Sequence, residues 1–232
     1  DKVIIITGAS SGIGKALAHE CARQGARLVL ASRTGTSDPD LQTLPGSVLF
    51  VPADVTRESD CESLIVKTVE KFGRIDVLIC NAGISMRALF IDLDLDVIRR
   101  LMDTNFWGTV YCAKYALPYL LQSKGSLVGI SSVAGYKGLP GRTGYSASKF
   151  AMQGFLEVLR IENLKKGLHV LIACPGFTAS NIRNVALSKD GTAQGETPLD
   201  ESKLMPAEEV ARQIVMAIKK KKDRIILTTQ GK

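Results

Sequence analysis

The segment GYSASKF (144–150) contains two side chains that can exchange protons with a substrate, Tyr145 and Lys149. They are four residues apart in a helical pattern, so they lie on one face of the predicted helix. A free tyrosine loses its proton at about pH 10, and a neighbouring ammonium group lowers that pKa because it favours the phenolate. The pair is therefore a candidate acid and base, although a tyrosine and a lysine at this spacing also occur on ordinary helix surfaces.

A glycine-rich loop, TGASSGIG (7–14), follows an apolar segment and precedes a helical pattern. Its glycines stand where a chain must turn tightly, approach a ligand and pack against a sheet, and the helix that follows offers free N–H groups to a pyrophosphate. The loop therefore predicts dinucleotide binding, with a purely structural turn as the alternative. The candidate cofactor-binding residues here are Gly8, Ser10, Ser11, Gly12, Ile13 and Gly14.

The end of the second apolar segment, LVLASRT, bears on the identity of the dinucleotide. A carboxylate at this place binds the ribose 2′-hydroxyl of NAD, whereas an arginine accepts the 2′-phosphate of NADP. Ser32 stands where the carboxylate would be expected, and Arg33 follows it. A guanidinium can fork onto a phosphate, so we expect NADP(H) to be preferred, with NAD(H) still possible.

Apolar, β-branched runs alternate with helical patterns along the chain. Strands are predicted at 2–8, 26–32, 47–55, 75–83, 125–132, 168–176 and 224–229, and helices at 14–25, 58–73, 93–122, 145–167 and 207–220. The helix over 93–122 is expected to be interrupted near Gly108 or Pro118. This alternation predicts an α/β doubly wound Rossmann fold, with a central, mainly parallel seven-stranded sheet flanked by helices, in a single domain over 1–232.

Two segments stand outside this alternation. Residues 33–46 show no helical period, so the crossover helix expected there is either absent from this chain or much reduced. The segment 177–205 is longer than an ordinary connection between a strand and a helix. It is expected to form a substrate lid, with a short amphipathic helix in NIRNVAL. A pocket with apolar walls is expected around the nicotinamide. Its candidate rim residues are Ser85, Met86, Arg87, Phe177, Ile182 and Leu187.

Composition narrows the function classes. The formal net charge of +7 suits an anionic ligand. The sequence lacks the basic stripe with interleaved aromatic residues that would indicate nucleic-acid binding. The five cysteines are scattered and form no CxxC pair, so we expect no disulfide framework, no metal site and a cytoplasmic location. No run of about 18 apolar residues predicts a membrane span. Flanking residues could carry an anchor, and the lysines at 219–222 give weak support for membrane-surface association.

Six motifs then occur in order: TGASSGIG, NAG at 81–83, TNFWG at 104–108, ISS at 130–132, YSASK at 145–149 and PG at 175–176. Together they resemble the short-chain dehydrogenase/reductases, with the closest likeness to members of the hydroxysteroid-dehydrogenase and 3-oxoacyl-reductase kind. The resemblance covers essentially the whole chain. It implies a catalytic tetrad of Asn105, Ser132, Tyr145 and Lys149 and a homodimer or homotetramer paired through the helices over 93–122 and 145–167. The apolar residues of these helices could equally face the sheet.

The resemblance also implies the remaining contacts to the cofactor. Asp54 and Val55 would meet the adenine, and Asn81, Ala82 and Gly83 its ribose, while Pro175, Gly176, Thr178 and Ser180 would edge the nicotinamide, whose ribose Tyr145 and Lys149 would also contact. Asn105 would position a water that links Lys149 to solvent. One departure is Cys80, which stands where the family usually has a first asparagine.

The leading hypothesis is an NADPH-dependent carbonyl reductase or alcohol dehydrogenase that acts on a small-molecule ketone or secondary alcohol, with Tyr145 as general acid and base. An NAD(H)-preferring dehydrogenase of the same family is the nearest alternative. A dinucleotide-binding sensor without catalysis is a third, against which the four tetrad residues argue. The sequence leaves the substrate and the direction of the reaction open.

Overall fold

The computed structural model describes residues 1–35, 38–195, 200 and 204–228. Seven parallel strands form one sheet in the order β3-β2-β1-β4-β5-β6-β7. The strands are β1 (Val3–Thr7), β2 (Arg27–Ser32), β3 (Val48–Pro52), β4 (Val77–Cys80), β5 (Ser126–Ile130), β6 (His169–Pro175) and β7 (Arg224–Leu227). The predicted doubly wound fold with seven strands is confirmed, and every strand pair is parallel.

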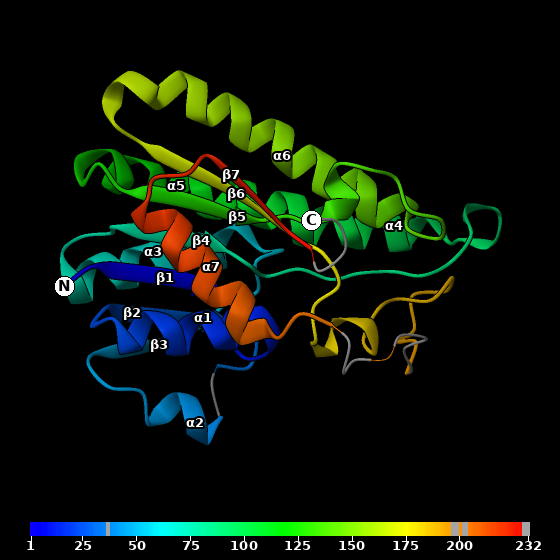
Figure 1. The fold of residues 1–232 in the computed structure, drawn as a ribbon, viewed down its shortest axis with the longest axis horizontal. Helices are drawn as coiled ribbons and strands as arrows, with labels where there is room; N and C mark the ends of the chain where they lie inside the picture. The colour runs from blue at the N-terminus through cyan, green and yellow to red at the C-terminus, as the bar shows by residue number, and fades with distance from the viewer. Residues whose placement is uncertain (36–37, 196–199, 201–203, 229–232) are drawn as a thin grey trace.

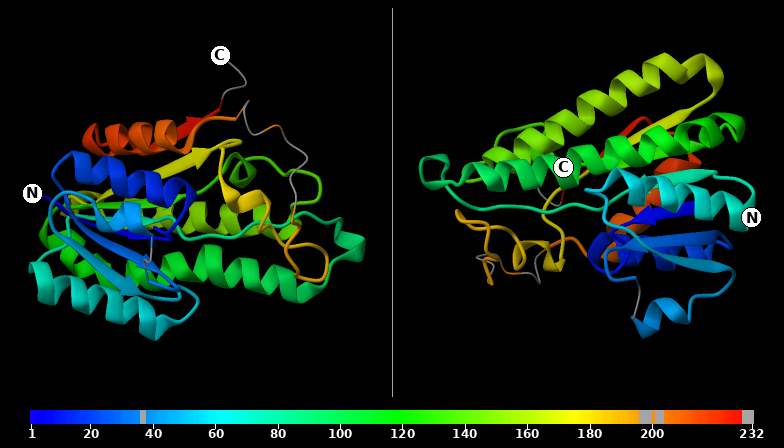
Figure 2. Two further views of the ribbon diagram at one scale, coloured as in Figure 1. Left: turned by 90° about the horizontal axis from the view of Figure 1, so that it is seen from below. Right: turned by 180° about the vertical axis from the view of Figure 1, so that it is seen from behind.

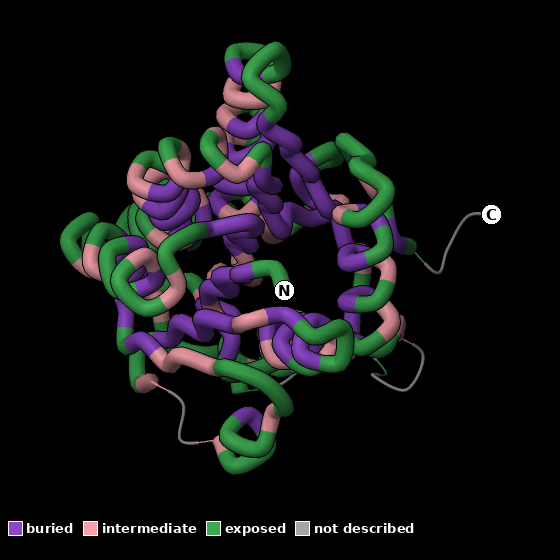
Figure 3. The backbone as a smooth tube through the Cα atoms, turned by 90° about the vertical axis from the view of Figure 1, so that its left-hand side faces the viewer, coloured by how far each residue is buried: buried purple, intermediate pink, exposed green. Residues whose placement is uncertain are grey.

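Helices cover both faces of the sheet (Figures 1 and 2). One face packs against α1 (Gly12–Arg23) and α7 (Ala207–Lys219), and the other against α3 (Glu58–Phe72), α5 (Gly108–Gln122) and α6 (Thr143–Asn163). The strands are apolar throughout because both of their faces are covered. The inner strands are accordingly buried along their whole length, as the tube in Figure 3 shows for the centre of the molecule.

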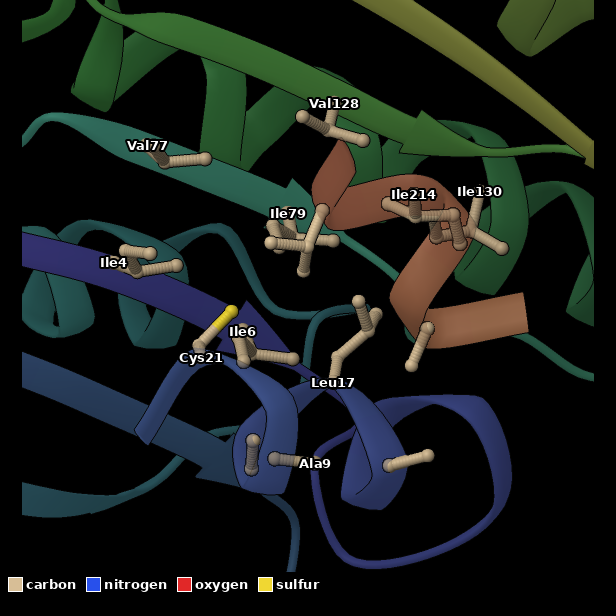
Figure 4. Close-up of a cluster of buried hydrophobic side chains, with 14 of the residues drawn as sticks. Ile4, Ile6, Ala9, Leu17, Cys21, Val77, Ile79, Val128, Ile130 and Ile214 are labelled. Atoms are coloured by element: carbon tan, nitrogen blue, oxygen red, sulfur yellow. The ribbon is translucent and has the colours of Figure 1, made fainter. Parts of the chain in front are cut away.

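Alternate residues of the strands β1 to β6 supply two cores. Ile4, Ile6 and Ile79 point to the side of α1 and α7, where they meet Leu17 and Ile214 (Figure 4). Their sequence neighbours point the other way, and the second core contains Ile5, Leu78, Leu127, Cys112 and Leu156. Full burial of a leucine or isoleucine side chain contributes about 1.5–3 kcal/mol, so these layers hold the strand ends in fixed positions for the site above them.

Two predicted features differ in detail. The described part of the segment 33–46 contains one short helix, α2 (Pro39–Gln42), whose N-cap Asp38 accepts from the N–H of Asp40 at 3.0 Å, so the crossover helix is reduced rather than absent. The helix predicted over 93–122 is three pieces: α4 (Leu95–Leu101), a π-helical segment (Met102–Trp107) and α5. The interruption therefore lies before Gly108, and Pro118 is accommodated inside α5.

The described residues include no helix that is both long and apolar enough to cross a bilayer. All five cysteines are free and buried. Short 3₁₀ turns complete the chain at Phe90–Asp92, Val133–Gly135, Leu164–Lys166 and Asn181–Arg183.

Candidate active site

A cavity of about 750 Å³ opens at the carboxyl ends of the strands. Its walls come from the segments that directly follow β1, β2, β3, β4, β5 and β6. The strand order reverses between β1 and β4, and open α/β sheets bind their ligands at the crevice that such a reversal creates. The topology alone therefore places the cavity where a dinucleotide is expected.

The glycine loop forms one wall of this cavity and leaves no room for side chains. A Cβ atom on Gly14 would lie 2.1 Å from the carbonyl oxygen of Gly8, and a Cβ on Gly8 would lie 2.8 Å from the Cα of Ala82. The Asn81 amide fastens the loop to β4 by donating to the carbonyls of Thr7 at 2.9 Å and Gly8 at 3.1 Å. The first turn of α1 has no acidic residue and no capping side chain, so its N–H groups suit a pyrophosphate.

The adenosine end of the cavity is shaped by the residues after β2. Ser32 donates its hydroxyl to the carbonyl of Gly35 at 2.5 Å, while the exposed Arg33 lines the rim. Lys15 lies outside the cavity lining, because its Nζ binds Asp38 at 2.7 Å and Asp40 at 2.9 Å across the gap to α2. Lys15 therefore neutralises the carboxylates of α2, and Arg33 is the cation that lines this rim.

Asp54 and Val55, at the end of β3, line the same region. The Asp54 carboxylate accepts from the Thr56 N–H at 3.0 Å and the Thr56 hydroxyl at 2.8 Å, which fixes the orientation of its side chain. The residues here present a carboxylate, a guanidinium and hydroxyl groups to the cavity or its edge, which are the polar groups that an adenosine with its ribose would need.

Tyr145, Ser132 and Lys149 meet at the other end of the cavity. Ser132 begins the turn after β5, and its hydroxyl accepts from the N–H of Ala134 at 3.2 Å. Tyr145, in the first turn of α6, lines the same part of the cavity, and the Ser132 hydroxyl is near enough to lower its pKa. The Nζ of Lys149 lies 5.8 Å from the centroid of the Tyr145 ring and donates to the carbonyl of Ile130 at 2.9 Å. Ser131 points away, because its hydroxyl accepts from Gln153 at 2.9 Å.

Burial dominates the proton affinities of this pair. It lowers the pKa of Lys149 to about 8, since the ammonium group lies in the protein interior. It raises the pKa of Tyr145, and this effect exceeds the lowering by the hydrogen bond from Ser132 and by the charge of Arg142. The structure thus differs from the expectation that Lys149 brings the tyrosine pKa down. Removal of the phenol from water outweighs the nearby cations.

Asn105 lies behind this centre, in the π-helical segment. Its Oδ1 accepts from the N–H of Ile84 at 2.8 Å, and its Nδ2 donates to the Ile84 carbonyl at 3.0 Å and to the Ser148 hydroxyl at 2.9 Å. A Cβ on Gly83 would lie 3.1 Å from the Asn105 Oδ1 and 3.4 Å from the Lys149 Nζ. Asn105 therefore joins the segment after β4 to α6, and it does not line the cavity itself.

The structure brings most of the predicted residues onto one surface. The cavity lining contains Gly8, Ser10, Ser11, Gly12, Ile13, Ser32, Arg33, Asp54, Val55, Asn81, Ala82, Gly83, Ser132, Tyr145, Lys149, Pro175, Gly176, Thr178 and Ser180. Gly14 and Asn105 do not line the cavity, because Gly14 packs under the loop and Asn105 lies behind Gly83.

The substrate rim is partly as expected. Ser85, Phe177, Ile182 and Leu187 line the cavity. Met86 is fully buried beneath the rim, and Arg87 turns aside to Gln194, whose Oε1 accepts from its Nη2 at 3.0 Å. Sequence reasoning missed further lining residues, among them Thr56, Thr104, Leu139, Arg142, Arg183 and Val185. Only Arg142 carried a usable signal, since it stands three residues before Tyr145.

The segment predicted as a lid borders the cavity from the side of β6. In NIRNVAL it forms a 3₁₀ turn, Asn181–Arg183, rather than the expected amphipathic helix. Leu187, in the middle of the segment, forms a bridge with Met86 after β4, and Thr178 forms a bridge with Met205, which joins the two ends of the segment to each other. The lid predicted over 177–205 also includes 196–199 and 201–203, which lie outside the described residues.

Curated proteins with related sequences are named as dehydrogenases. The chain is 42% identical over 206 residues to 11-beta-hydroxysteroid dehydrogenase A of Arachis hypogaea, which covers 86% of this chain and 58% of that protein. It is 39% identical over 187 residues to 11-beta-hydroxysteroid dehydrogenase-like 2 of Arabidopsis thaliana, covering 78% of this chain and 60% of the relative. The chain thus spans about three fifths of the length of these curated relatives.

Solved structures agree. An alcohol dehydrogenase from Thermococcus sibiricus, complexed with 5-hydroxy-NADP, superimposes with a TM-score of 0.83 at 25% identity, over 97% of this chain and 95% of that one. A short-chain dehydrogenase from Streptomyces avermitilis gives 0.84 at 26% identity, over 98% and 88% of the two chains. The sequence model of the short chain dehydrogenase family matches residues 2–190. The chain therefore belongs to the short chain dehydrogenase family.

Proposed function

We propose that the chain is an NADPH-dependent carbonyl reductase or alcohol dehydrogenase, acting on a ketone or secondary alcohol. The observation that carries the proposal is that the hydroxyls of Ser132 and Tyr145 line one cavity together with the buried Lys149, close enough for Ser132 to lower the pKa of Tyr145, while Arg33 and Asp54 line the same cavity elsewhere. Similarity to proteins named as hydroxysteroid and alcohol dehydrogenases, one of them complexed with 5-hydroxy-NADP, supports it. The bound coenzyme would supply or accept the hydride.

The residues of this chain would handle the carbonyl oxygen and its proton. The Ser132 hydroxyl, fixed at the end of β5, holds the oxygen beside Tyr145. The Tyr145 hydroxyl donates its proton to that oxygen during reduction and accepts it during oxidation. Lys149, buried one helical turn further along α6, keeps a cation next to the phenol below about pH 8. Asn105 keeps α6 in register with the segment after β4 through its bonds to Ser148 and Ile84.

The coenzyme would span the cavity from the glycine loop to Gly176. We assign the pyrophosphate to the N-terminus of α1, the adenine to Asp54 and Val55, and the 2′-phosphate to Arg33. An NAD(H) preference is the alternative. Ser32 argues against it, because a carboxylate usually binds the ribose hydroxyls of NAD at this position and the serine hydroxyl carries no charge. The nicotinamide would lie against Pro175, Gly176, Thr178 and Ser180.

We further propose that residues 1–232 work as one domain, with 177–205 as the lid, and that the chain pairs with a second copy. Exposed apolar residues on and beside α5 and α6 support the pairing: Trp107 (42% exposed), Phe150 (47%), Val158 (54%) and Ile161 (64%). Apolar side chains gathered on neighbouring helices are typical of an interface between subunits.

A single experiment tests the activity. Ketones, steroids and 3-oxoacyl thioesters are offered with NADPH, and the loss of coenzyme absorbance is followed for the parent protein, Tyr145→Phe and Tyr136→Phe. Tyr136 follows β5 and does not line the cavity, so its variant is the matched control. We expect Tyr145→Phe to lower kcat by roughly a hundredfold to ten-thousandfold, the range of general acid catalysis, with coenzyme binding retained. Equal turnover by all three proteins on one substrate would contradict the proposed role of Tyr145.

A non-catalytic sensor would bind the coenzyme and reduce nothing. Coenzyme binding, followed by NADPH fluorescence, is therefore measured beside turnover. Binding without turnover of any carbonyl would favour the sensor.

A further inference from the structure

Arg142 is a cation at the substrate end of the cavity that the proposed chemistry does not use. It is the N-cap residue of α6 and lines the cavity together with Ser132 and Tyr145. Residues three apart at the start of a helix lie on the same side of it, so Arg142 and Tyr145 flank one space. No side chain caps this end of α6, and its positive dipole adds to the charge of the guanidinium.

Hydrogen bonds hold the guanidinium of Arg142 in place but use only part of its donors. Its Nη1 donates to the hydroxyl of Ser85 at 2.7 Å and to the carbonyl of Met86 at 2.5 Å, across the cavity rim after β4. A guanidinium has five N–H donors, and these two bonds use only those of Nη1. Among the described residues no acceptor binds its Nε or Nη2, and neither is sealed in the interior without a partner. The remaining donors therefore serve the cavity.

No carboxylate of the described residues neutralises Arg142. The two acidic residues that line the cavity are Asp54, at the adenosine end, and the exposed Asp103, and neither is paired with it. Burial lowers the pKa of Arg142, and the like charges of Arg87 and Arg183 act in the same direction. A half-buried cation among other cations is stabilised by an anion, and this one lies beside the proposed reaction centre.

The walls around this cation are apolar. Leu139, Ile182, Val185 and Leu187 line the same end of the cavity. A ligand that fits both features has an aliphatic chain and one anionic end. A guanidinium binds a carboxylate with two parallel hydrogen bonds, which also fixes the direction of the chain.

We propose that Arg142 binds a carboxylate on the substrate, so that the chain acts on aliphatic oxo acids, with the ketone at Ser132 and Tyr145 and the carboxylate at Arg142. This assignment rests on the proposed function, of which it names the substrate class. Reduction of the ketone to the hydroxy acid takes a hydride from NADPH and a proton from Tyr145, and the carboxylate is unchanged.

Acetoacetate and levulinate, each paired with its methyl ester, test the assignment. The ester has the same ketone and chain but no charge. We measure kcat/KM with NADPH for the parent protein, Arg142→Gln, Arg142→Lys and the control Arg99→Gln, whose arginine is exposed on α4 outside the cavity. NADPH fluorescence shows which variants are folded.

The parent protein should prefer at least one acid to its ester by about tenfold or more, because a hydrogen-bonded ion pair is lost with the ester. Arg142→Gln should lower kcat/KM for the acid by roughly tenfold to a hundredfold and for the ester by less than about threefold. Arg142→Lys should recover part of the preference, and Arg99→Gln should keep all of it. If Arg142→Gln does not fold, the test uses the ratio of kcat/KM for acid and ester in the parent protein and the change of that ratio in Arg142→Lys.

Equal losses on acid and ester would overturn the proposal, because Arg142 would then act only as a brace for Ser85 and Met86. A parent protein that prefers the esters would overturn it as well. Calorimetry measures the binding of levulinate to the complex of the protein with NADP⁺. It distinguishes failure of the carboxylate site from failure of the proposed reductase function. Binding that depends on Arg142, without reduction of any carbonyl, would keep the carboxylate site and reject the reductase. Reduction of neutral ketones but not of oxo acids would support the reductase and reject the carboxylate site.

Discussion

The ammonium group of Lys149 lies 5.8 Å from the centre of the Tyr145 ring, and burial moves the two pKa values in opposite directions. In water, tyrosine loses its proton at about the same pH as lysine. Here the pKa of Lys149 falls to about 8 while that of Tyr145 rises, so the lysine titrates first. The pair is therefore a cation beside a neutral phenol at neutral pH, and two neutral groups above about pH 8.

A first prediction concerns the cost of burying that cation. The folded pKa of Lys149 lies below its unfolded value of 10.5, so the unfolded state binds more protons between about pH 8 and 10.5. The penalty is complete below pH 8 and is relieved as the pH rises toward the unfolded pKa. At about 1.4 kcal/mol per pKa unit, the penalty at neutral pH is roughly 3 kcal/mol.

Urea unfolding of the parent protein and Lys149→Met, from pH 7 to pH 10, measures this. The variant should be the more stable at pH 7, and the difference should shrink toward pH 10 because only the parent protein gains stability. The comparison with the variant cancels the titration of all other groups. A difference that stays constant over the range would show that Lys149 does not change its charge there.

A second prediction concerns Asp76, which is 2% exposed at the other end of β4. Burial raises the pKa of its carboxyl, but the N–H of Val3 at 2.9 Å and the guanidinium of Arg74 at 2.6 Å outweigh this, and the net pKa lies below its usual value. A lowered carboxyl pKa stabilises the fold above the unfolded pKa, and that stability is lost as the pH falls through the folded pKa.

Asp76→Asn should reduce the free energy of unfolding by about 2 kcal/mol at pH 7, because the charged hydrogen bonds are lost. The difference from the parent protein should begin to shrink near the unfolded pKa of about 3.9 and should disappear only below the folded pKa, which is lower still. Asp92→Asn, an exposed change, should have little effect over this pH range. Thermal unfolding of the three proteins over the same range decides, and a pH-independent loss would mean that shape rather than charge is responsible.

A third prediction tests the coenzyme assignment. Arg33→Ala should raise the KM for NADPH by roughly tenfold to a hundredfold, the value of a charged hydrogen-bonded pair, and leave the KM for NADH nearly unchanged. Arg57→Ala, on the exposed N-cap of α3 outside the cavity lining, is the control. A parent protein with a KM for NADH well below that for NADPH would reject the NADP assignment outright.

A fourth prediction uses two glycines in different surroundings. A Cβ on Gly14 would lie 2.1 Å from the Gly8 carbonyl oxygen, whereas a Cβ on Gly154, inside α6, would meet nothing within 4 Å. Gly14→Ala should therefore weaken coenzyme binding severely, and Gly154→Ala should stabilise the protein by about 0.5–1 kcal/mol through helix propensity. Fluorescence titration with NADPH and urea unfolding measure the two effects. Normal binding by Gly14→Ala would show that the loop can move aside.

Much of the fold was predictable because the signals are local. Strands buried on both faces are apolar throughout, and each helix has its own period, so all seven strands and their alternation with helices follow from the sequence. Boundaries were less accurate, since α1 begins at Gly12 inside the glycine loop. The four-residue α2 escaped the period analysis because it is too short to show one.

The site divides in the same way. Tyr145 and Lys149 share one helix turn, and Gly8 to Gly14 share one loop, so their spacing made them candidates, which the other motifs then supported. Ser132 and Asn105 needed the resemblance to the family. Arg142 and Arg183 reach the cavity from segments whose path depends on long-range contacts, such as the bond from Arg142 to Ser85, fifty-seven residues away in the chain. The raised pKa of Tyr145 could not be foreseen, because burial is a property of the assembled structure.

The π-helical segment joins α4 and α5 into one continuous helical rod and sets which side of α5 faces the protein interior. Val97, Leu101, Asn105 and Thr109 are all buried, and they recur every four residues. In an α-helix such positions drift by about 40° at each repeat, because a turn takes about 3.6 residues. The wider turns of Met102–Trp107 absorb that drift, so one face of the rod stays on the protein interior from α4 to α5. Loss of a single residue there would rotate α5 by about 100° against α4 and turn Cys112 away from the sheet.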